Sequence, residues 1–231
     1  MRRLIALGIG IPLMVWLTRQ CRKPSGALGR RVARVMNLTH SGLTDWGLSH
    51  VSVGRADRIL DVGCGGGRTI QKLANMASDG LVSGVDYSSA SVDIARQTNA
   101  DTIAAGRVTV ERGPVSALPF SDRTFDLVTA IETHYYWPNL EDGMREILRV
   151  LKPGGTFALI AETVKDRQPN PLYRVAMPLL GATYLTMNEH TTLLRHAGFV
   201  DVAIDTRSIG WMCATARRAV SEEPAKASGD L

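Results

Sequence analysis

The sequence predicts an α/β protein built on a doubly wound parallel β-sheet, and three observations support this fold class. From residue 58 onward, short apolar runs of strand length alternate with amphipathic segments of helical length, which is the pattern of successive βαβ units. A glycine-rich turn at residues 63–67 joins the first predicted strand to its helix. Asp86 follows the second predicted strand, at the sheet edge where ligands of open α/β sheets bind.

The length and composition fit one globular α/β domain with additions. The chain has 231 residues, of which 45% are hydrophobic and 21% are charged, and this size is sufficient to bury a core. The three cysteines, Cys21, Cys64 and Cys213, are scattered singly. This spacing argues against a disulfide framework or a zinc site and indicates a reducing compartment. We therefore expect a cytoplasmic protein with no bound metal.

The net charge of +5 is distributed unevenly along the chain. Residues 1–58 contain ten Lys and Arg but only two acidic residues, Asp45 and Asp57, so this segment carries +8 and the remainder carries −3. The basic character therefore belongs to the N-terminal segment. A basic footprint across the whole domain, as nucleic-acid binding requires, is not indicated.

Residues 1–23 have an apolar middle between basic ends. The run from Leu4 to Leu17 would form a helix of roughly 21 Å, whereas the hydrocarbon core of a membrane is roughly 30 Å thick. Pro12 interrupts the run, and no small-residue cleavage site follows it. One interpretation is an anchor at the membrane interface, which would place the protein peripherally at the inner face of a membrane. The other is a helix packed over the mouth of the protein's own pocket.

Residues 24–56 are predicted to form a helical cap before the first strand. The segment opens with a break at Pro24-Ser25-Gly26. Two amphipathic helices are expected to follow it, the second over about residues 44–53 with Trp46, Leu48 and Val51 on its apolar side.

The glycine turn has to be assigned to one of three cofactor classes. A P-loop ends in Gly-Lys-Ser/Thr, whereas Arg68 and Thr69 follow the last glycine here. The dinucleotide fingerprint needs a small residue at position 68, and Arg68 is large. The pattern that remains is an acidic residue followed by alternating glycines: Asp61, Gly63, Gly65 and Gly67. Such glycines let the backbone approach a ligand closely, next to a helix N-terminus.

This pattern resembles the first motif of the class I S-adenosylmethionine (SAM)-dependent methyltransferases. The segment from Gly113, G-P-V-S-A-L-P-F-S-D-R-T-F-D-L-V, is similar to the family pattern G-D-A-x-x-L-P-F-x-D-x-x-F-D-x-V, and L-K-P-G-G at residues 151–155 matches a further family turn. The resemblance covers residues 57–216. It implies a Rossmann-like, seven-stranded, mostly parallel sheet of order 3-2-1-4-5-7-6 with an N-terminal helical extension. Residues 217–231 are expected to be a disordered tail.

The resemblance also implies SAM as the cofactor. In the turn it assigns cofactor binding to Asp61, Gly63, Cys64, Gly65 and Gly67. Asp86 would accept hydrogen bonds from both ribose hydroxyls, and Tyr87 would lie against the adenine. Where the family usually has an Asp that binds the adenine amino group, this chain has Pro114. The adenine would then be held by the Val115 N–H and apolar contacts, at a loss of about 0.5–1.5 kcal/mol.

The methyl acceptor is expected beside the aromatic-rich segment after the fourth strand, where the family places this site. Tyr135, Tyr136 and Trp137 are predicted to contact the substrate, and their faces would stabilise the cation formed on a carbon acceptor. An oxygen acceptor would benefit from a general base, for which His134 is the first candidate and Glu132 the second. The apolar insertion at residues 162–188 is interpreted either as a lid or as ordinary core packing.

Together these features predict a SAM-dependent methyltransferase that acts on an oxygen or carbon of a hydrophobic small molecule, such as a lipid, quinone, sterol or polyketide. The alternative is a SAM-binding regulatory or membrane-associated module without catalysis, which the Pro114 departure leaves open. The oligomeric state cannot be inferred from the sequence.

Overall fold

The computed structural model describes residues 41–167, 177–178, 181–207 and 210–220. The predicted segment 1–23, residues 24–40 of the predicted cap and residues 221–231 of the predicted tail lie outside these ranges. The strands are β1 (Arg58–Val62), β2 (Leu81–Asp86), β3 (Val108–Arg112), β4 (Phe125–Ile131), β5 (Leu151–Ala161), β6 (Phe199–Thr206) and β7 (Met212–Arg218). The helices are α3 (Ser41–Leu48), α4 (Arg68–Met76), α5 (Ser89–Thr98), α6 (Ala100–Ala104), the 3₁₀ helix η1 (His134–Tyr136), α7 (Leu140–Val150) and α9 (Met187–His196).

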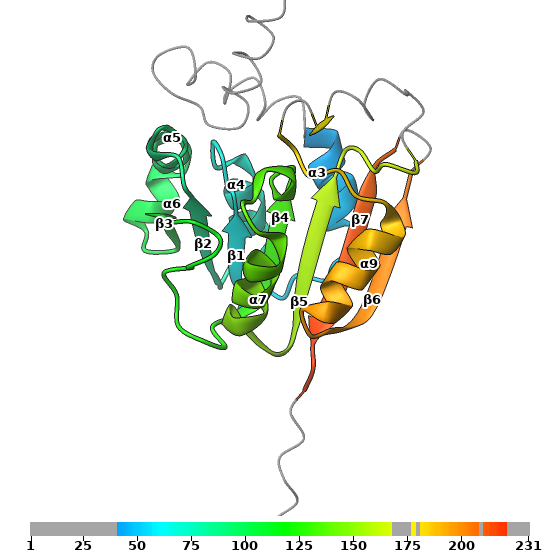
Figure 1. The fold of residues 1–231 in the computed structure, drawn as a ribbon. Coiled ribbons are helices and arrows are strands. Elements are labelled where there is room, and N and C mark those ends of the chain that lie inside the picture. Colours follow the sequence, from blue (N-terminus) through cyan, green and yellow to red (C-terminus); the bar gives the residue numbers. More distant parts are fainter. Residues whose placement is uncertain (1–40, 168–176, 179–180, 208–209, 221–231) are drawn as a thin grey trace, which may run out of the picture.

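The seven strands form one sheet in the order β3-β2-β1-β4-β5-β7-β6 (Figure 1). The pairs β1–β2, β2–β3, β1–β4 and β4–β5 are parallel, while β7 runs antiparallel to both β5 and β6. This topology confirms the predicted mostly parallel sheet and its strand order. The order reverses direction at β1 and β4, so the carboxyl ends of these strands meet at a topological switch point where ligands bind in such sheets.

Helices cover both faces of the sheet (Figure 1). The helices α3, α4 and α5 pack on one face through a buried cluster that includes Leu43, Ile70 and Val92. The helices α7 and α9 pack on the other face through a second cluster that includes Ile147 and Leu194. The central strands are therefore buried on both sides, as their nearly continuous apolar sequences predict.

Local hydrogen bonds fix where the helices begin. The side chain of Asn139 accepts the N–H of Glu141 at 3.0 Å and so caps α7. Thr186 and Glu189 form a reciprocal capping box at the start of α9. The helix α4 begins differently, because Gly67 precedes it in a left-handed conformation with φ 79° and no side chain of the described residues caps it. Within the described part of the chain, its N-terminus therefore faces the switch point without a side-chain cap.

The boundaries of three elements differ from the predicted ones. The helix α3 lies at Ser41–Leu48 rather than at residues 44–53, and β7 continues to Arg218, beyond the expected domain end at 216. The L-K-P-G-G segment is part of β5, where the pairing register with β4 shifts and Gly154 takes φ 76°. Glycine permits this local irregularity without ending the strand.

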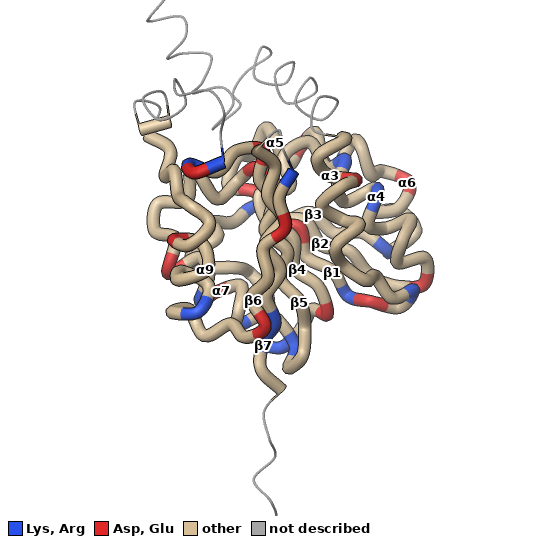
Figure 2. The backbone as a smooth tube through the Cα atoms, turned by 90° about the vertical axis from the view of Figure 1, so that its right-hand side faces the viewer, with Lys and Arg blue, Asp and Glu red and all other residues tan. Residues whose placement is uncertain are grey.

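The described part of the 162–188 insertion contributes to the protein core. Met177, Ala182 and Tyr184 are buried in the cluster that also contains α7 and α9 residues. The remainder of this insertion lies outside the described residues. Within the described ranges, Lys and Arg are interspersed with Asp and Glu (Figure 2). No described helix combines the length and apolarity that a membrane crossing requires.

Candidate active site

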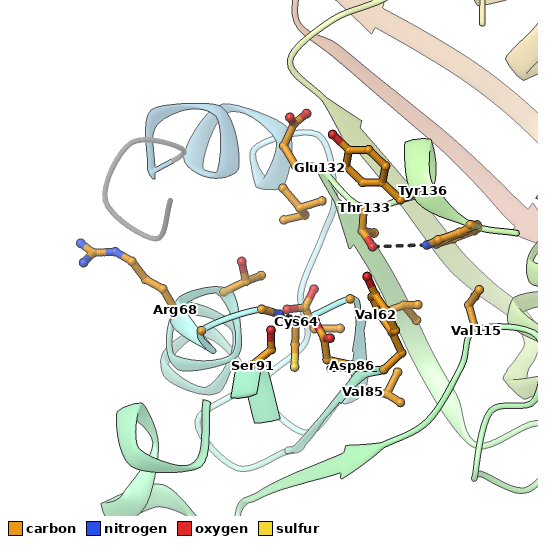
Figure 3. Close-up of a pocket in the computed structure, with 18 of the residues that line it drawn as sticks. Val62, Cys64, Arg68, Val85, Asp86, Ser91, Val115, Glu132, Thr133 and Tyr136 are labelled. Carbon is orange, nitrogen blue, oxygen red and sulfur yellow. Dashed lines mark hydrogen bonds between the residues drawn. The ribbon is translucent and has the colours of Figure 1, made fainter. Parts of the chain in front are cut away.

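A cavity of about 260 Å³ lies at the carboxyl ends of β1, β2 and β4 (Figure 3). The turns that follow these strands line it, together with α3 and the start of α4. Ten of the site residues predicted from the sequence are in this lining: Asp61, Gly63, Cys64, Gly65, Asp86, Tyr87, Val115, Glu132, Tyr136 and Trp137. The fold thus brings most of the predicted cofactor and acceptor residues to one place.

The glycine turn is held against β2 by its own backbone. The N–H groups of Gly63 and Cys64 both donate to the Val85 carbonyl, at 2.8 and 3.1 Å. Gly63 has φ 71°, and a Cβ atom there would lie 2.1 Å from Thr133 Oγ1. Gly65 has φ 51°, but a Cβ atom there would meet no described atom within 4 Å. Gly63 is therefore required for packing, whereas Gly65 borders open space that a ligand can occupy.

Gly67 is outside the described lining of the cavity. It ends the turn instead, since its N–H donates to the Cys64 carbonyl at 2.9 Å and its own carbonyl accepts from Asn99 Nδ2 at 2.9 Å. The neighbouring Gly66 lines the cavity. The third glycine of the motif thus shapes the loop, while Gly65 and Gly66 line the cavity.

The Asp86 carboxylate is oriented by two backbone donors. Its Oδ2 accepts the Gly65 N–H at 3.0 Å and its Oδ1 accepts the Ser88 N–H at 2.8 Å. Only 8% of the residue is exposed, and this burial raises the pKa of Asp86 above its usual range. Each carboxylate oxygen has a further lone pair, so the group can still accept two hydrogen bonds from a ligand in the cavity.

Asp61 is a buried carboxyl beside the turn. Thr129 Oγ1 donates to its Oδ1 at 2.7 Å, and the residue is 2% exposed. Burial raises the pKa of Asp61 to about 7, the nearby charge of Asp86 acts in the same direction, and the Thr129 hydrogen bond opposes them. Two carboxyl groups close together in low dielectric favour a positively charged ligand.

Tyr136 and Trp137 form the aromatic wall of the cavity. The Trp137 Nε1–H donates to Thr133 Oγ1 at 3.2 Å, which is the bond drawn in Figure 3. Because Thr133 also packs against Gly63, this side chain connects the aromatic wall to the glycine turn. Figure 3 shows Glu132 and Tyr136 on one side of the cavity and Cys64 and Asp86 on the other.

The structure places His134 and Tyr135 away from the positions that their predicted roles need. Neither is in the described lining of the cavity. His134 is fully buried, its Nε2 lies 3.1 Å from Nε2 of His190, and burial holds its pKa well below the usual range. Tyr135 is 4% exposed and packs in the core. Successive residues of a 3₁₀ helix point about 120° apart, so only Tyr136 of η1 faces the cavity.

Several lining residues were not predicted. Arg68, Thr69 and Lys72 come from α4, and Ser41 and Thr44 come from α3. Arg68 and Lys72 are four residues apart and so share one helix face. Their common location could therefore have been predicted from the sequence. The Lys72 ammonium donates to Ser41 Oγ at 3.0 Å and also pairs with Asp45. This contact, which fastens α3 over the cavity, could not be derived from spacing alone. Gly66, Thr133 and Pro114 also belong to the lining.

Comparisons with known proteins agree with this geometry. Residues 59–155 match the family model described as a methyltransferase domain. The chain is 30% identical over 151 residues to the O-methyltransferase cnsE of Penicillium expansum, covering 64% of this chain and 54% of that protein. It is 33% identical over 133 residues to the ubiquinone/menaquinone biosynthesis C-methyltransferase UbiE of Geobacter sulfurreducens, covering 55% and 52%.

This chain contains a match to a methyltransferase domain, and its relatives support its assignment to the class I SAM-dependent methyltransferases. It spans about half the length of these two curated relatives. A solved SAM-dependent methyltransferase from Aquifex aeolicus has the same fold, with a TM-score of 0.67 and 19% identity over 82% of this chain and 98% of that one. SAM is the cofactor of this family, and no group of three or more metal-binding side chains is present among the described residues.

The residues of this cavity fit SAM. The open space above Gly65 provides room beside a turn in which Gly63 and Gly65 have positive φ. Asp61 and Asp86 supply negative charge for a ligand that carries a sulfonium and an ammonium group. The uncapped N-terminus of α4 suits a carboxylate group. The open space, the two carboxyl groups and the helix N-terminus thus correspond to the bulk, the positive charges and the carboxylate of SAM.

Proposed function

We propose that this protein transfers a methyl group from SAM to an oxygen or carbon of a hydrophobic small molecule. The observation that carries the proposal is that a single cavity holds the glycine turn and Asp86 on one side and Glu132, Tyr136 and Trp137 on the other. The named relatives include both an O-methyltransferase and a C-methyltransferase of quinone biosynthesis. They support an acceptor of the small, hydrophobic kind, such as a lipid, quinone, sterol or polyketide.

In this proposal different residues of the cavity contact different parts of SAM. Asp86 accepts hydrogen bonds from the ribose hydroxyls with the lone pairs that Gly65 and Ser88 leave available. Tyr87 covers the adenine, and the Val115 backbone together with Pro114 borders it. The turn from Gly63 to Gly66 and the carboxyl of Asp61 contact the amino-acid part.

Methyl transfer mainly requires the protein to align the acceptor with the methyl group. SAM supplies an electrophilic methyl group on a sulfonium centre. Tyr136 and Trp137 orient the acceptor and exclude water, so that the two reacting atoms are held in line. For a hydroxyl acceptor, Glu132 is the proton acceptor we assign, because it lines the cavity and His134 does not. For a carbon acceptor, the aromatic faces stabilise positive charge.

A binding module without catalysis is the second candidate, and Pro114 favours it. Proline offers no side-chain acceptor to the adenine, and it lines the cavity at that position. Weak cofactor binding would suit a protein that senses SAM rather than consumes it. The 162–188 insertion as a lid and residues 1–23 as a peripheral membrane anchor remain proposals that fit either function.

Two measurements test the proposed function in sequence. Calorimetric titration of the full chain with SAM should show one site, and Asp86→Asn should weaken it by about tenfold or more, since a charge-assisted bond contributes about 1.5–3 kcal/mol. The exposed Asp79, which pairs with Arg55 on the surface, provides the matched control Asp79→Asn. Conversion of SAM to its demethylated product should then appear with quinone, sterol or lipid fractions. SAM binding without turnover on any fraction would favour the binding module.

A further inference from the structure

Glu132 has an unusual backbone conformation for its residue type. It follows β4 with φ 56°, in the left-handed region that residues with a Cβ atom rarely occupy. The other non-glycine residues with positive φ among those described are Arg123 and Asp201, and neither lines the cavity. Strain of this kind persists where the surroundings force it, and it is found most often at functional sites.

The Tyr135 hydroxyl and the Glu162 backbone both bind the Glu132 carboxylate. The Tyr135 hydroxyl lies 3.1 Å from Oε1, and the backbone N–H of Glu162 donates to the same oxygen. The Tyr135 oxygen itself accepts the Thr163 N–H at 3.3 Å, which leaves its single proton to donate. The Thr163 carbonyl, at 3.3 Å, competes for this proton. The carboxylate is nearer and charged, so it forms the stronger bond.

Tyr135 is itself held firmly. Its backbone carbonyl accepts the Thr183 N–H at 2.7 Å, and its ring lies 4.2 Å from that of His134 between ring centroids. The side chain is buried in the core together with its hydrogen bonds. The hydroxyl is therefore a fixed donor that joins the segment after β4 to the segment after β5.

We propose that Tyr135 is a positioning residue whose hydroxyl keeps the Glu132 carboxylate ionised and directed into the cavity, where it accepts the proton of a hydroxyl-bearing methyl acceptor. This inference rests on the proposed methyl transfer and narrows its acceptor class. In the step, the acceptor oxygen forms a bond to the methyl carbon, and the carbon–sulfur bond breaks with its electron pair remaining on sulfur. The hydroxyl proton passes to Glu132.

Other ionisable groups surround Glu132, and the test must leave them unchanged. Glu162 directly follows β5, and His134 packs against the Tyr135 ring. The others line the cavity: Asp61, Cys64, Arg68, Lys72, Asp86, Tyr87 and Tyr136. Tyr135→Phe removes one oxygen atom and none of these groups. Tyr184→Phe is the matched control, because the Tyr184 hydroxyl bonds Thr163 Oγ1 at 2.9 Å in the same network without being the donor to Glu132.

The decisive experiment is a ¹³C NMR titration of side-chain carboxyls in protein labelled at glutamate. The Glu132 signal is identified by its loss in Glu132→Gln. In Tyr135→Phe it should titrate at higher pH than in the unsubstituted protein, because the ionised form has lost a donor. In Tyr184→Phe it should titrate as in the unsubstituted protein. An unchanged titration in Tyr135→Phe, or an equal shift in both variants, would overturn the positioning role.

Two further readouts separate this inference from the proposed function. SAM affinity, measured by calorimetry, should be equal in Tyr135→Phe and the unsubstituted protein, and a parallel loss of SAM binding would indicate a merely structural role. If the unsubstituted protein binds no SAM, the proposed function is wrong. The NMR titration still tests the effect of Tyr135 on Glu132, because it needs no SAM. With an acceptor found by screening, Tyr135→Phe should lower kcat more than it raises KM. Methylation of carbon acceptors alone would overturn the acceptor class.

Discussion

His134 and His190 form a buried pair whose Nε2 atoms lie 3.1 Å apart. The Nδ1–H of His190 donates to the Thr186 carbonyl at 2.8 Å, so its Nε2 carries a lone pair and accepts the Nε2–H of His134. Both rings are therefore neutral, and burial lowers the pKa of each below its usual value. The pair ties η1 to α9 behind the cavity, which is why His134 is unavailable to a substrate.

Replacement of His134 should affect stability rather than cofactor binding. His134→Ala leaves a cavity and removes the donor to His190, so we expect the free energy of unfolding to fall by about 2–4 kcal/mol. SAM affinity should be unchanged. Denaturant unfolding and calorimetry measure the two quantities, and His196→Ala, an exposed position on α9, is the control. Intact stability with lost SAM binding would contradict this account.

The histidine pair should also make stability depend on pH. Histidine in the unfolded chain has a pKa of about 6.5, whereas the folded pair stays neutral to lower pH. Below about pH 6.5 the unfolded state therefore binds more protons, and the free energy of unfolding should fall as pH decreases. His134→Phe combined with His190→Leu should flatten this slope in urea unfolding between pH 5 and 8. Both the double variant and the unsubstituted protein carry Asp61, whose raised pKa makes stability rise as pH decreases. The difference between their two slopes therefore reports the contribution of the histidine pair.

SAM affinity should weaken as pH falls below about 7. The pKa of Asp61 is raised to about 7, and its protonation removes negative charge from a cavity that binds a cationic ligand. Thr129→Val deletes the hydrogen bond that favours the ionised carboxyl, so the loss of affinity should begin at higher pH. Asp61→Asn should bind weakly with little pH dependence. Calorimetry at pH 5.5–8.5 checks all three, and a steep pH dependence retained in Asp61→Asn would argue against Asp61.

Two glycines of the same turn should respond differently to alanine. At Gly63 the added Cβ would lie 2.1 Å from Thr133 Oγ1, so Gly63→Ala should unfold more easily and also lose SAM binding. At Gly65 no described atom is in reach, so Gly65→Ala should cost only the left-handed strain of about 1–2 kcal/mol. Its Cβ would still enter the space for SAM. Thermal unfolding paired with calorimetry should therefore show Gly65→Ala as chiefly a binding defect.

Pro114→Asp should strengthen SAM binding. The substitution supplies the acceptor that the family usually offers to the adenine amino group, and such a bond contributes about 0.5–1.5 kcal/mol, or roughly a 2- to 10-fold lower Kd. Pro114→Ala removes the ring without adding an acceptor and is the control. Equal affinity in the aspartate and alanine variants would mean that the adenine does not lie beside residue 114.

The amino-acid sequence by itself determined the features that depend on local spacing. Alternating apolar runs predicted the parallel sheet. The acid-glycine pattern and the resemblance that it carries predicted eight cofactor residues, and seven of them line one cavity. These features follow from short-range rules, since a strand end, a glycine turn and a helix start are set within about ten residues of one another.

Only the tertiary structure decided which way the side chains of residues 132–137 face. One residue of offset along η1 turns a side chain from the core to the cavity, so His134 pairs with His190 from a helix 56 positions away while Tyr136 meets the cavity. Tyr135 likewise joins Glu132 to the segment after β5. Such contacts between distant segments depend on how the elements pack, and no local pattern of residues encodes them.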